Sequence, residues 1–220
     1  MGLESLLRLC EIRPPSPRTQ AHLSHMPADL IASKADLRRA MREHLRTVSE
    51  ASMMSTSERI HDHLITNALS GLRSGMVVAL FGGIQGEPDL RSLVPWLKGR
   101  GVHPIFFAFT DDRLVPRIVD DAHSLTRGLF GVWMPDDRCP SLAFSELDYV
   151  LVPGLAFDRQ GGRLGRGRGY FDRLFDSPGV RAQRIGVCLE CQVVPAVPME
   201  PHDARMHQLI TEQGVIRIVH

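Results

Sequence analysis

The sequence predicts an α/β fold with a largely parallel central sheet. Short apolar runs of strand length recur from Met76 to the end of the chain, stretches with helical spacing lie between them, and glycines bound several of the runs. Continuous apolar runs are typical of strands buried on both faces, and their alternation with helices indicates a parallel sheet. Such sheets bind ligands beyond the carboxyl ends of their strands, so we expect the functional site in the loops that follow strands.

Residues 1–32 lack hydrophobic periodicity and contain Pro14, Pro15, Pro17 and Pro27. We expect a flexible N-terminal extension over 1–32 and one α/β domain over 33–220. No apolar run approaches the ~20 residues of a membrane span, and the start of the chain lacks a signal-peptide core. The protein is therefore expected to be cytoplasmic.

Two helices are expected before the first strand. Ser33 and Asp36 form a capping box that opens the first helix, and Ser55 and Glu58 form a second box that opens the next one, which should end at Gly71. Apolar residues at helical spacing support both helices; they are Leu37, Met41, Leu45 and Val48 in the first, and Ile60, Leu64 and Leu69 in the second.

Six apolar runs are the expected strands. They are, in chain order, MVVALFGG from Met76, VHPIFFAF, RLVPRIV, YVLVPG, RIGVCL and HQLIT. Between the first two runs, LRSLVPWLKGRG has a helical pattern that Pro95 should break or kink.

Composition limits the function. The 220 residues contain 26 Lys and Arg against 25 Asp and Glu, a formal charge of +1, so no global field attracts nucleic acid or an acidic membrane, and any anion site must be local. Cys188 and Cys191 form a lone C-x-x-C. Because a structural zinc site needs two further ligands, we expect buried, unpaired thiols there instead.

The stretch Val152–Phe175 is the most informative part of the chain. It follows the YVLV run, precedes a helical pattern, and contains Gly165, Gly167 and Gly169 at alternate positions. Glycine lets backbone amides approach a ligand, and amides at a helix N-terminus favour phosphate. Arginine forks match phosphate oxygens, and arginines stand within and around the glycines at positions 163, 166, 168 and 173. It is neither a Walker loop nor a dinucleotide G-x-G-x-x-G.

Two other interpretations of this loop remain. Arg-Gly repeats also occur in disordered RNA-binding segments, but those are long and lack the apolar strand and helix that flank this loop. A purely structural glycine turn would not need several arginines. The near-neutral charge and the absence of an aromatic stacking platform also disfavour RNA.

Several motifs resemble one family. PGLAFD, RLGRG and GYFD follow in order and spacing the signature of the 5-formyltetrahydrofolate cyclo-ligases, also called methenyltetrahydrofolate synthetases. The segments Lys34–Arg38, Gly86–Asp89 and Glu200–Asp203 with LITEQGVI resemble further family motifs, so that the resemblance covers about 34–219. It implies a Rossmann-like three-layer fold of the ribose-phosphate isomerase and CoA-transferase type.

The resemblance implies roles for individual residues. Glu87, Arg166, Arg168 and Tyr170 should face a reduced folate, and the last three of these should be catalytic. Asp172 and Asp203 should bind Mg²⁺, a cation that prefers hard oxygen ligands. The residues implied in ATP binding are Lys34, Arg38, Arg163, Leu164, Gly165, Arg166, Gly167, Arg168, Gly169, Tyr170 and Phe171. Lys34 and Arg38 also share a helix face by spacing alone.

The implied activity is ATP-dependent conversion of 5-formyltetrahydrofolate to 5,10-methenyltetrahydrofolate through a phosphorylated formyl group. The alternative is a non-catalytic paralogue that binds nucleotide or folate. The expected partners are a reduced folate and ATP, without nucleic acid or membrane, in a monomer or weak homodimer. Four residues depart from the family's usual pattern: Leu90, Met134, Arg168 and His207.

Overall fold

The structure is a computed structural model and describes residues 33–110, 113–128 and 131–219. The expected extension over 1–32 lies outside the described residues and stays a prediction. Within the described ranges no helix is long and apolar enough to cross a membrane.

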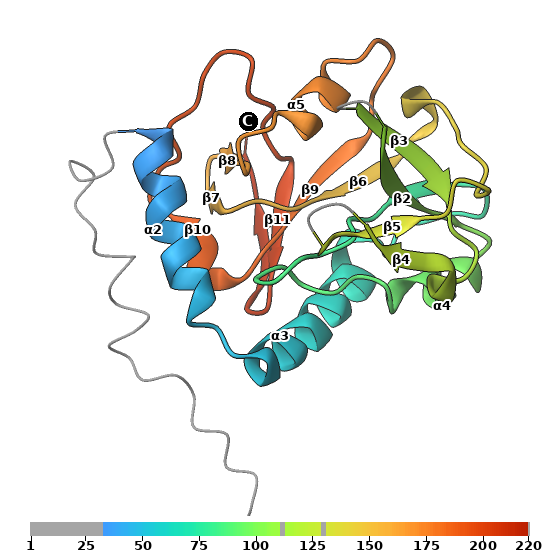
Figure 1. Ribbon diagram of the computed structural model, residues 1–220, viewed down its shortest axis with the longest axis horizontal. Coiled ribbons are helices and arrows are strands. Elements are labelled where there is room, and N and C mark those ends of the chain that lie inside the picture. Colours follow the sequence, from blue (N-terminus) through green and yellow to red (C-terminus); the bar gives the residue numbers. More distant parts are fainter. Residues whose placement is uncertain (1–32, 111–112, 129–130, 220) are drawn as a thin grey trace, which may run out of the picture.

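A seven-stranded sheet in the order β12-β11-β9-β6-β1-β2-β3 forms the centre of the fold (Figure 1). The five inner strands are parallel, whereas β12 and β3 pair antiparallel at the two edges. The predicted α/β class with a mostly parallel sheet is therefore confirmed. The strand bounds are β1 Val77–Ala79, β2 His103–Thr110, β3 Arg113–Ile118, β6 Tyr149–Val152, β9 Gln183–Val187, β11 Gln208–Thr211 and β12 Gly214–Arg217.

The two faces of this sheet are covered by different elements. One face packs against α3 (Glu50–His63), its π-helical continuation η3 (Leu64–Ala68) and α4 (Leu93–Lys98). The other face packs against α5 (Tyr170–Phe175) and neighbouring loops. Alternate residues of a strand point to opposite faces, so Val150 and Val152 of β6 join the second core while Leu151 joins the first. This burial on both faces explains the continuous apolar runs.

The helix α2 (Lys34–Arg46) packs elsewhere, on a small sheet of β10 (Val193–Val194), β7 (Ala156–Asp158) and β8 (Arg163–Leu164). Its buried residues Leu37, Met41 and Leu45 form a third core with that sheet. Figure 1 shows α2 standing beside these strands, away from the large sheet. The start of the described chain is thereby brought next to residues more than a hundred positions later.

Three further short pieces and one hairpin complete the described fold. The hairpin joins β4 (Leu125–Arg127) to β5 (Trp133–Pro135), and the 3-10 turns are η4 (Ala122–Ser124), η6 (Phe144–Glu146) and η7 (Glu190–Gln192). Cys139, Cys188 and Cys191 are free thiols, and burial raises the pKa of the Cys191 thiol to about 12. Cys188 is fully buried and Cys191 partly so.

Two local predictions are wrong. The second helix begins at Glu50, because the Ser49 side chain caps it by accepting from the Ser52 amide, and Ser55 lies inside the helix. The second concerns α4, which is helical on both sides of Pro95. This proline lies in the first turn of α4, which begins at Leu93, and an amide is not needed there. The predicted cap at Ser33 is confirmed, since its hydroxyl accepts from the Asp36 amide.

The position of the α3 cap can be tested by two serine substitutions. Ser49→Ala removes the acceptor for an orphan amide and should lower the free energy of unfolding by about 1 kcal/mol. Ser55→Ala, within the same helix, should change it by less than about 0.5 kcal/mol. Urea unfolding of both variants measures the difference. A larger loss for Ser55→Ala than for Ser49→Ala would contradict the observed helix start.

Candidate functional site

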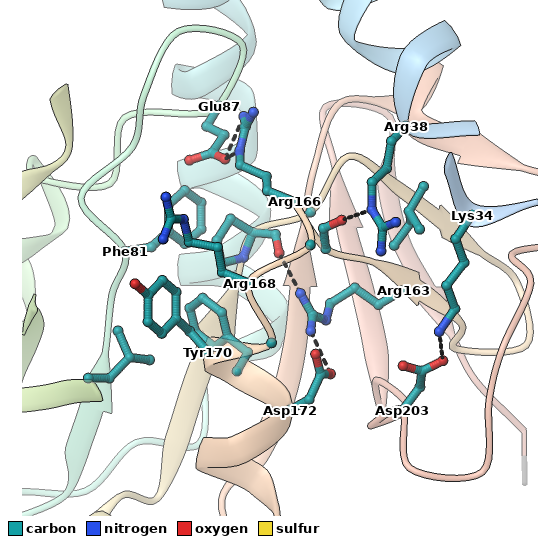
Figure 2. A pocket seen from close by; sticks show the side chains of 18 of the residues that line it. Lys34, Arg38, Phe81, Glu87, Arg163, Arg166, Arg168, Tyr170, Asp172 and Asp203 are labelled. Carbon is teal, nitrogen blue, oxygen red and sulfur yellow. Dashed lines mark hydrogen bonds and ion pairs between the residues drawn. The ribbon is translucent and has the colours of Figure 1, made fainter. Parts of the chain in front are cut away.

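A pocket of about 990 Å³ lies where α2, the loop after β8 and the start of α5 meet the carboxyl ends of β1 and β6. Every site residue expected from the sequence lines it, from Lys34 to Asp203. Figure 2 shows their side chains arranged around one space. The pocket lies among loops that follow strands, the region where the site is expected, although α2, which precedes all strands, supplies one wall.

The loop 165–169 has a backbone that requires glycine at two positions. Gly167 has a φ of 105° and Gly169, which precedes α5, has a φ of 66°. Residues other than glycine rarely adopt this left-handed region of backbone conformation. The alternating glycines therefore serve the turn that leads from β8 into α5, in addition to any approach they give a ligand.

Two arginines of α2 hold this loop in place by donating hydrogen bonds to its backbone carbonyl groups. Arg38 donates through Nε to the Gly165 oxygen over 3.0 Å, and Arg42 donates to the Arg166 oxygen over 3.2 Å. On the other side Arg173 donates to the Arg168 oxygen over 2.9 Å. The role of Arg42 was not predicted, although its spacing of four from Arg38 continues the helix face that starts at Lys34.

Arg163 is buried beneath the loop and pairs with Asp172. Its guanidinium donates to the Asp172 Oδ1 over 2.8 Å and to the Pro153 oxygen over 3.4 Å, and its side chain is only 5% exposed. Removing either member of such a pair would leave a charge with little access to water, which is costly. Arg163 therefore joins the end of β6, β8 and the first turn of α5 at the floor of the pocket.

Lys34 and Asp203 form a second ion pair across the pocket (Figure 2). The Lys34 Nζ lies 2.6 Å from the Asp203 Oδ2 and 3.2 Å from a Glu200 oxygen. Burial raises the pKa of Asp203, but the hydrogen bonds from Lys34 and from the Glu200 amide outweigh it and hold that pKa below its ordinary value. Ligand atoms of Glu200, His202 and Asp203 lie within 4.8 Å of one another, a grouping that could hold a cation.

Glu87 is a buried carboxylate that faces the loop. Arg166 donates through Nε to the Glu87 Oε1 over 2.9 Å, and the Ile84 amide donates to the other oxygen over 3.3 Å. The buried Arg166 Nη2 lies 2.8 Å from Oε1 but is not aligned for a hydrogen bond with any described residue. Burial raises the pKa of Glu87, and the Arg166 charge offsets this only in part. A ligand in the pocket that donates a hydrogen bond to Glu87 would offset the cost of burying its carboxylate.

Aromatic rings form the remaining wall. Phe107 meets Phe171 edge to face with ring centroids 5.8 Å apart, and Phe109 meets Tyr170 at 5.0 Å. Together with Phe81 they line the pocket beside Glu87. Phe107 and Phe109 were expected only as strand residues. Their separation by two positions placed them on one face of β2, but which face would meet the loop was not visible in the sequence.

Three of the four residues that depart from the family's pattern lie outside the pocket. Leu90 is fully buried in the core beneath α3 and α4, and Met134 belongs to β5. The His207 Nδ1 accepts from the Arg184 amide over 3.0 Å at the entry to β11. Arg168 alone lines the pocket.

The fold and this site define a class: an α/β protein whose glycine–arginine loop, opposite a basic helix, closes a pocket with one cationic and one aromatic end. Comparison with known proteins identifies the family. The model of the 5-formyltetrahydrofolate cyclo-ligase family matches residues 30–212, and the chain belongs to that family.

Individual relatives agree. The protein named 5-formyltetrahydrofolate cyclo-ligase from Mycolicibacterium smegmatis is 31% identical over 194 residues, which are 84% of this chain and 97% of that one. The Escherichia coli K12 protein of the same name is 29% identical over 143 residues, 63% of this chain and 79% of its own. The NMR structure of Aquifex aeolicus 5,10-methenyltetrahydrofolate synthetase superposes with a TM-score of 0.73 at 27% identity, covering 85% of this chain and 93% of that one.

The balance of forces on Glu87 can be tested by pH. A carboxyl whose pKa is raised on folding binds more protons in the folded state, so it contributes a stability that is lost as pH rises above its ordinary pKa. Relative to Glu87→Gln, the wild type should therefore become less stable as pH increases from 4 to 7. Urea unfolding of both proteins across that range measures the difference. The opposite slope would mean that the Arg166 charge outweighs burial.

Proposed function

We propose that the protein converts 5-formyltetrahydrofolate to 5,10-methenyltetrahydrofolate with conversion of ATP to ADP and phosphate. The observation that supports this best is the division of one pocket into two ends joined by the loop 165–169. One end is lined by cations and the other by aromatic rings around a buried carboxylate. Its volume of about 990 Å³ is at the upper end of the ~300–1,000 Å³ of small-molecule sites, as two ligands side by side require.

The cationic end suits a triphosphate. Lys34 and Arg38 approach from α2, and Arg166 and Arg168 belong to the loop itself. Guanidinium groups bind phosphate oxygens through paired N–H donors, and the glycines allow backbone amides to come close as well. Arg163 is buried and committed to Asp172, so we assign it to holding the floor of the ATP site, with direct phosphate contact falling to its neighbours.

The aromatic end suits the pterin ring of a folate. Tyr170 and the phenylalanines offer flat faces and edges for a planar heterocycle. Glu87 can accept hydrogen bonds from the ring N–H and amino groups, which is favourable because its carboxylate is buried with Arg166 and one amide as its hydrogen-bond donors. The Arg166 side chain therefore connects the two ends, contacting Glu87 from within the phosphate loop.

The proposed chemistry is phosphoryl transfer followed by ring closure. The oxygen of the N5-formyl group attacks the γ-phosphorus, and the bond to ADP breaks. N10 then attacks the formyl carbon and loses its proton, and the carbon–oxygen bond breaks to release phosphate and leave the methenyl bridge. Arg166 and Arg168 stand where the two ends meet, so they can neutralise the phosphoryl oxygens as charge moves between ADP and the formyl oxygen.

Asp172 and Asp203 suit a hard cation as ligands. Arg163 donates to the Asp172 Oδ1 and Lys34 to the Asp203 Oδ2, and each carboxylate has a second oxygen that could ligate; the second oxygen of Asp203 lies 3.8 Å from the His202 Nε2. When bound with the nucleotide, Mg²⁺ would neutralise phosphate charge and would need only these two oxygens, phosphate and water. Lys34 keeps Asp203 turned into the pocket, and Arg163 does the same for Asp172.

The proposal includes the type of α/β fold. A parallel sheet with helical cover on both faces supports the Rossmann-like, three-layer arrangement expected from the sequence. We also propose that the protein acts on small molecules alone, without nucleic acid or membrane, as a monomer or weak homodimer.

A direct assay tests the function. Protein, 5-formyltetrahydrofolate and Mg-ATP are mixed, and the absorbance of methenyltetrahydrofolate is followed. Turnover in the wild type with a large loss in Arg166→Ala is the expected result, because a charge-assisted contact to phosphate contributes about 1.5–3 kcal/mol. Binding of both ligands without turnover would identify the alternative, a non-catalytic binding protein. Binding of neither would reject the proposal.

The two carboxylates give a second prediction. Asp172→Asn and Asp203→Asn should each raise the Mg²⁺ concentration needed for half-maximal activity, and the double variant should show less than the sum of both effects, since residues sharing one ligand act as a unit. The measurement is a Mg²⁺ titration of activity. Asp62→Asn, an exposed acid on α3, is the matched control and should be silent. Independent effects would argue against a shared ion.

A further inference from the structure

The loop 197–206 carries Asp203 and contains no helix or strand. Its two ends are anchored in different cores, because Val197 packs with α2 and the small sheet whereas Met206 packs against the large sheet. Between these ends the loop brings the Asp203 carboxylate to Lys34 across the pocket (Figure 2). The position of Asp203 therefore depends on how the backbone of this loop is held.

The turn between β7 and β8 contacts the loop 197–206 at its first and last residues. The Asp158 Oδ2 accepts a hydrogen bond from the Val197 amide over 2.8 Å. The Gly161 oxygen accepts one from the Met206 amide, also over 2.8 Å. A single tight turn thereby holds both ends of the loop that carries Asp203, although the turn itself belongs to a different sheet connection.

Asp158 is the buried side chain that makes this connection. It is only 3% exposed, and its Oδ1 accepts from the Gln160 amide over 2.9 Å and from the Gly162 amide over 2.8 Å. Its other oxygen accepts from Val197. An ionised carboxylate has only acceptors, so it suits a position that faces backbone amides on both sides. Asp158 thus joins the backbone of the turn to the backbone of the loop.

Two glycines allow the turn to approach the loop this closely. Gly161 has a φ of 83°, and a Cβ at this position would lie 2.6 Å from the Met206 oxygen. A Cβ at Gly162 would collide with the Asp158 carboxylate. The next residue is Arg163, which pairs with Asp172. The same turn is therefore adjacent to both carboxylates proposed to bind Mg²⁺.

We propose that Asp158 is a positioning residue for Asp203: it fixes the loop 197–206 and thereby sets where the Asp203 carboxylate stands for Lys34 and for a cation. Asp158 lies behind the pocket wall and does not line the pocket, so it acts only through the backbone that it holds. Its consequence for Mg²⁺ rests on the proposed function, whereas the hold on the loop is a property of the fold.

Asp158→Asn tests this role with little change in side-chain size. One carboxylate oxygen becomes an amide nitrogen, which repels a backbone N–H; with its oxygen toward Gln160 and Gly162, the asparagine keeps two bonds and releases Val197. Hydrogen–deuterium exchange over 197–206 should then be faster relative to β6 and β9. The Mg²⁺ concentration for half-maximal activity should increase about tenfold, the low end of the effect of removing a group that orients a metal ligand. KM for 5-formyltetrahydrofolate at saturating Mg²⁺ should not change.

Two further variants separate positioning from stability. Thr211→Val removes another buried polar group, which donates to Glu190 over 2.7 Å in β11; it should lower stability without changing exchange over 197–206 or the Mg²⁺ requirement. Arg205→Gln removes an exposed side chain that donates to the Gln160 oxygen over 3.1 Å, so it should fold normally. It should change both measurements in the same direction as Asp158→Asn, by a smaller factor, and it decides the matter if Asp158→Asn does not fold.

The inference and the proposed function can fail separately. Unchanged exchange over 197–206 in Asp158→Asn, or faster exchange with an unchanged Mg²⁺ requirement, would show that Asp158 has only a structural role. A wild type without turnover would reject the proposed function, and the exchange measurement alone would then decide whether Asp158 holds the loop.

Discussion

The site depends on the hydrogen bonds by which α2 holds the carbonyl groups of the loop 165–169. Arg38 and Arg42 bind the oxygens of Gly165 and Arg166, residues 127 and 124 positions away. The loop has glycine at alternate positions, so contacts from outside it are needed to fix its backbone. Its shape is therefore conditional on α2 docking to the small sheet through Leu37, Met41 and Leu45. One helix outside the large sheet thereby sets the geometry of the pocket.

This dependence explains which parts of the site the sequence could predict. Residues 163–172 are contiguous, and their glycine and arginine pattern carries its own physical meaning. The contact of Lys34 with Asp203 spans 169 positions and that of Arg166 with Glu87 spans 79, so only tertiary packing brings them together. Motif resemblance placed these residues in one site, but could not show that they would pair with one another. The aromatic wall was missed because Phe107 and Phe109 first serve as strand residues.

The elements of the fold also divide into those that local sequence predicts and those that depend on tertiary packing. The inner strands were predictable because burial on both faces demands unbroken apolar runs. Strands β7, β8 and β10 have two or three residues each, too few to show a period, and they exist because α2 covers them. The start of α3 was misplaced because Ser55 with Glu58 has the form of a capping box, whereas Ser49 offers the actual cap. A cap motif is local, but which of two serines begins the helix depends on the chain that packs against the core.

Opposite charges in the pocket are paired with one another: Lys34 with Asp203, Arg163 with Asp172 and Arg166 with Glu87. Such pairing lowers the cost of burying these charges while the pocket is free of ligand.

The pairing of charges also limits which ligands can bind. An anion alone would attract Lys34 away from Asp203 and leave the Asp203 carboxylate to repel the same anion. A cation alone would find the position beside Asp203 already occupied by the Lys34 ammonium group. An anion that arrives with its own cation can exchange both partners at once, because phosphate replaces the carboxylate for Lys34 while the metal replaces the ammonium for Asp203. The affinities for the two ions are then coupled and reciprocal. Paired charges of this kind suit an anion that carries its own cation better than either ion alone, and the Mg²⁺ complex of ATP invoked in the proposed phosphoryl transfer is such an anion.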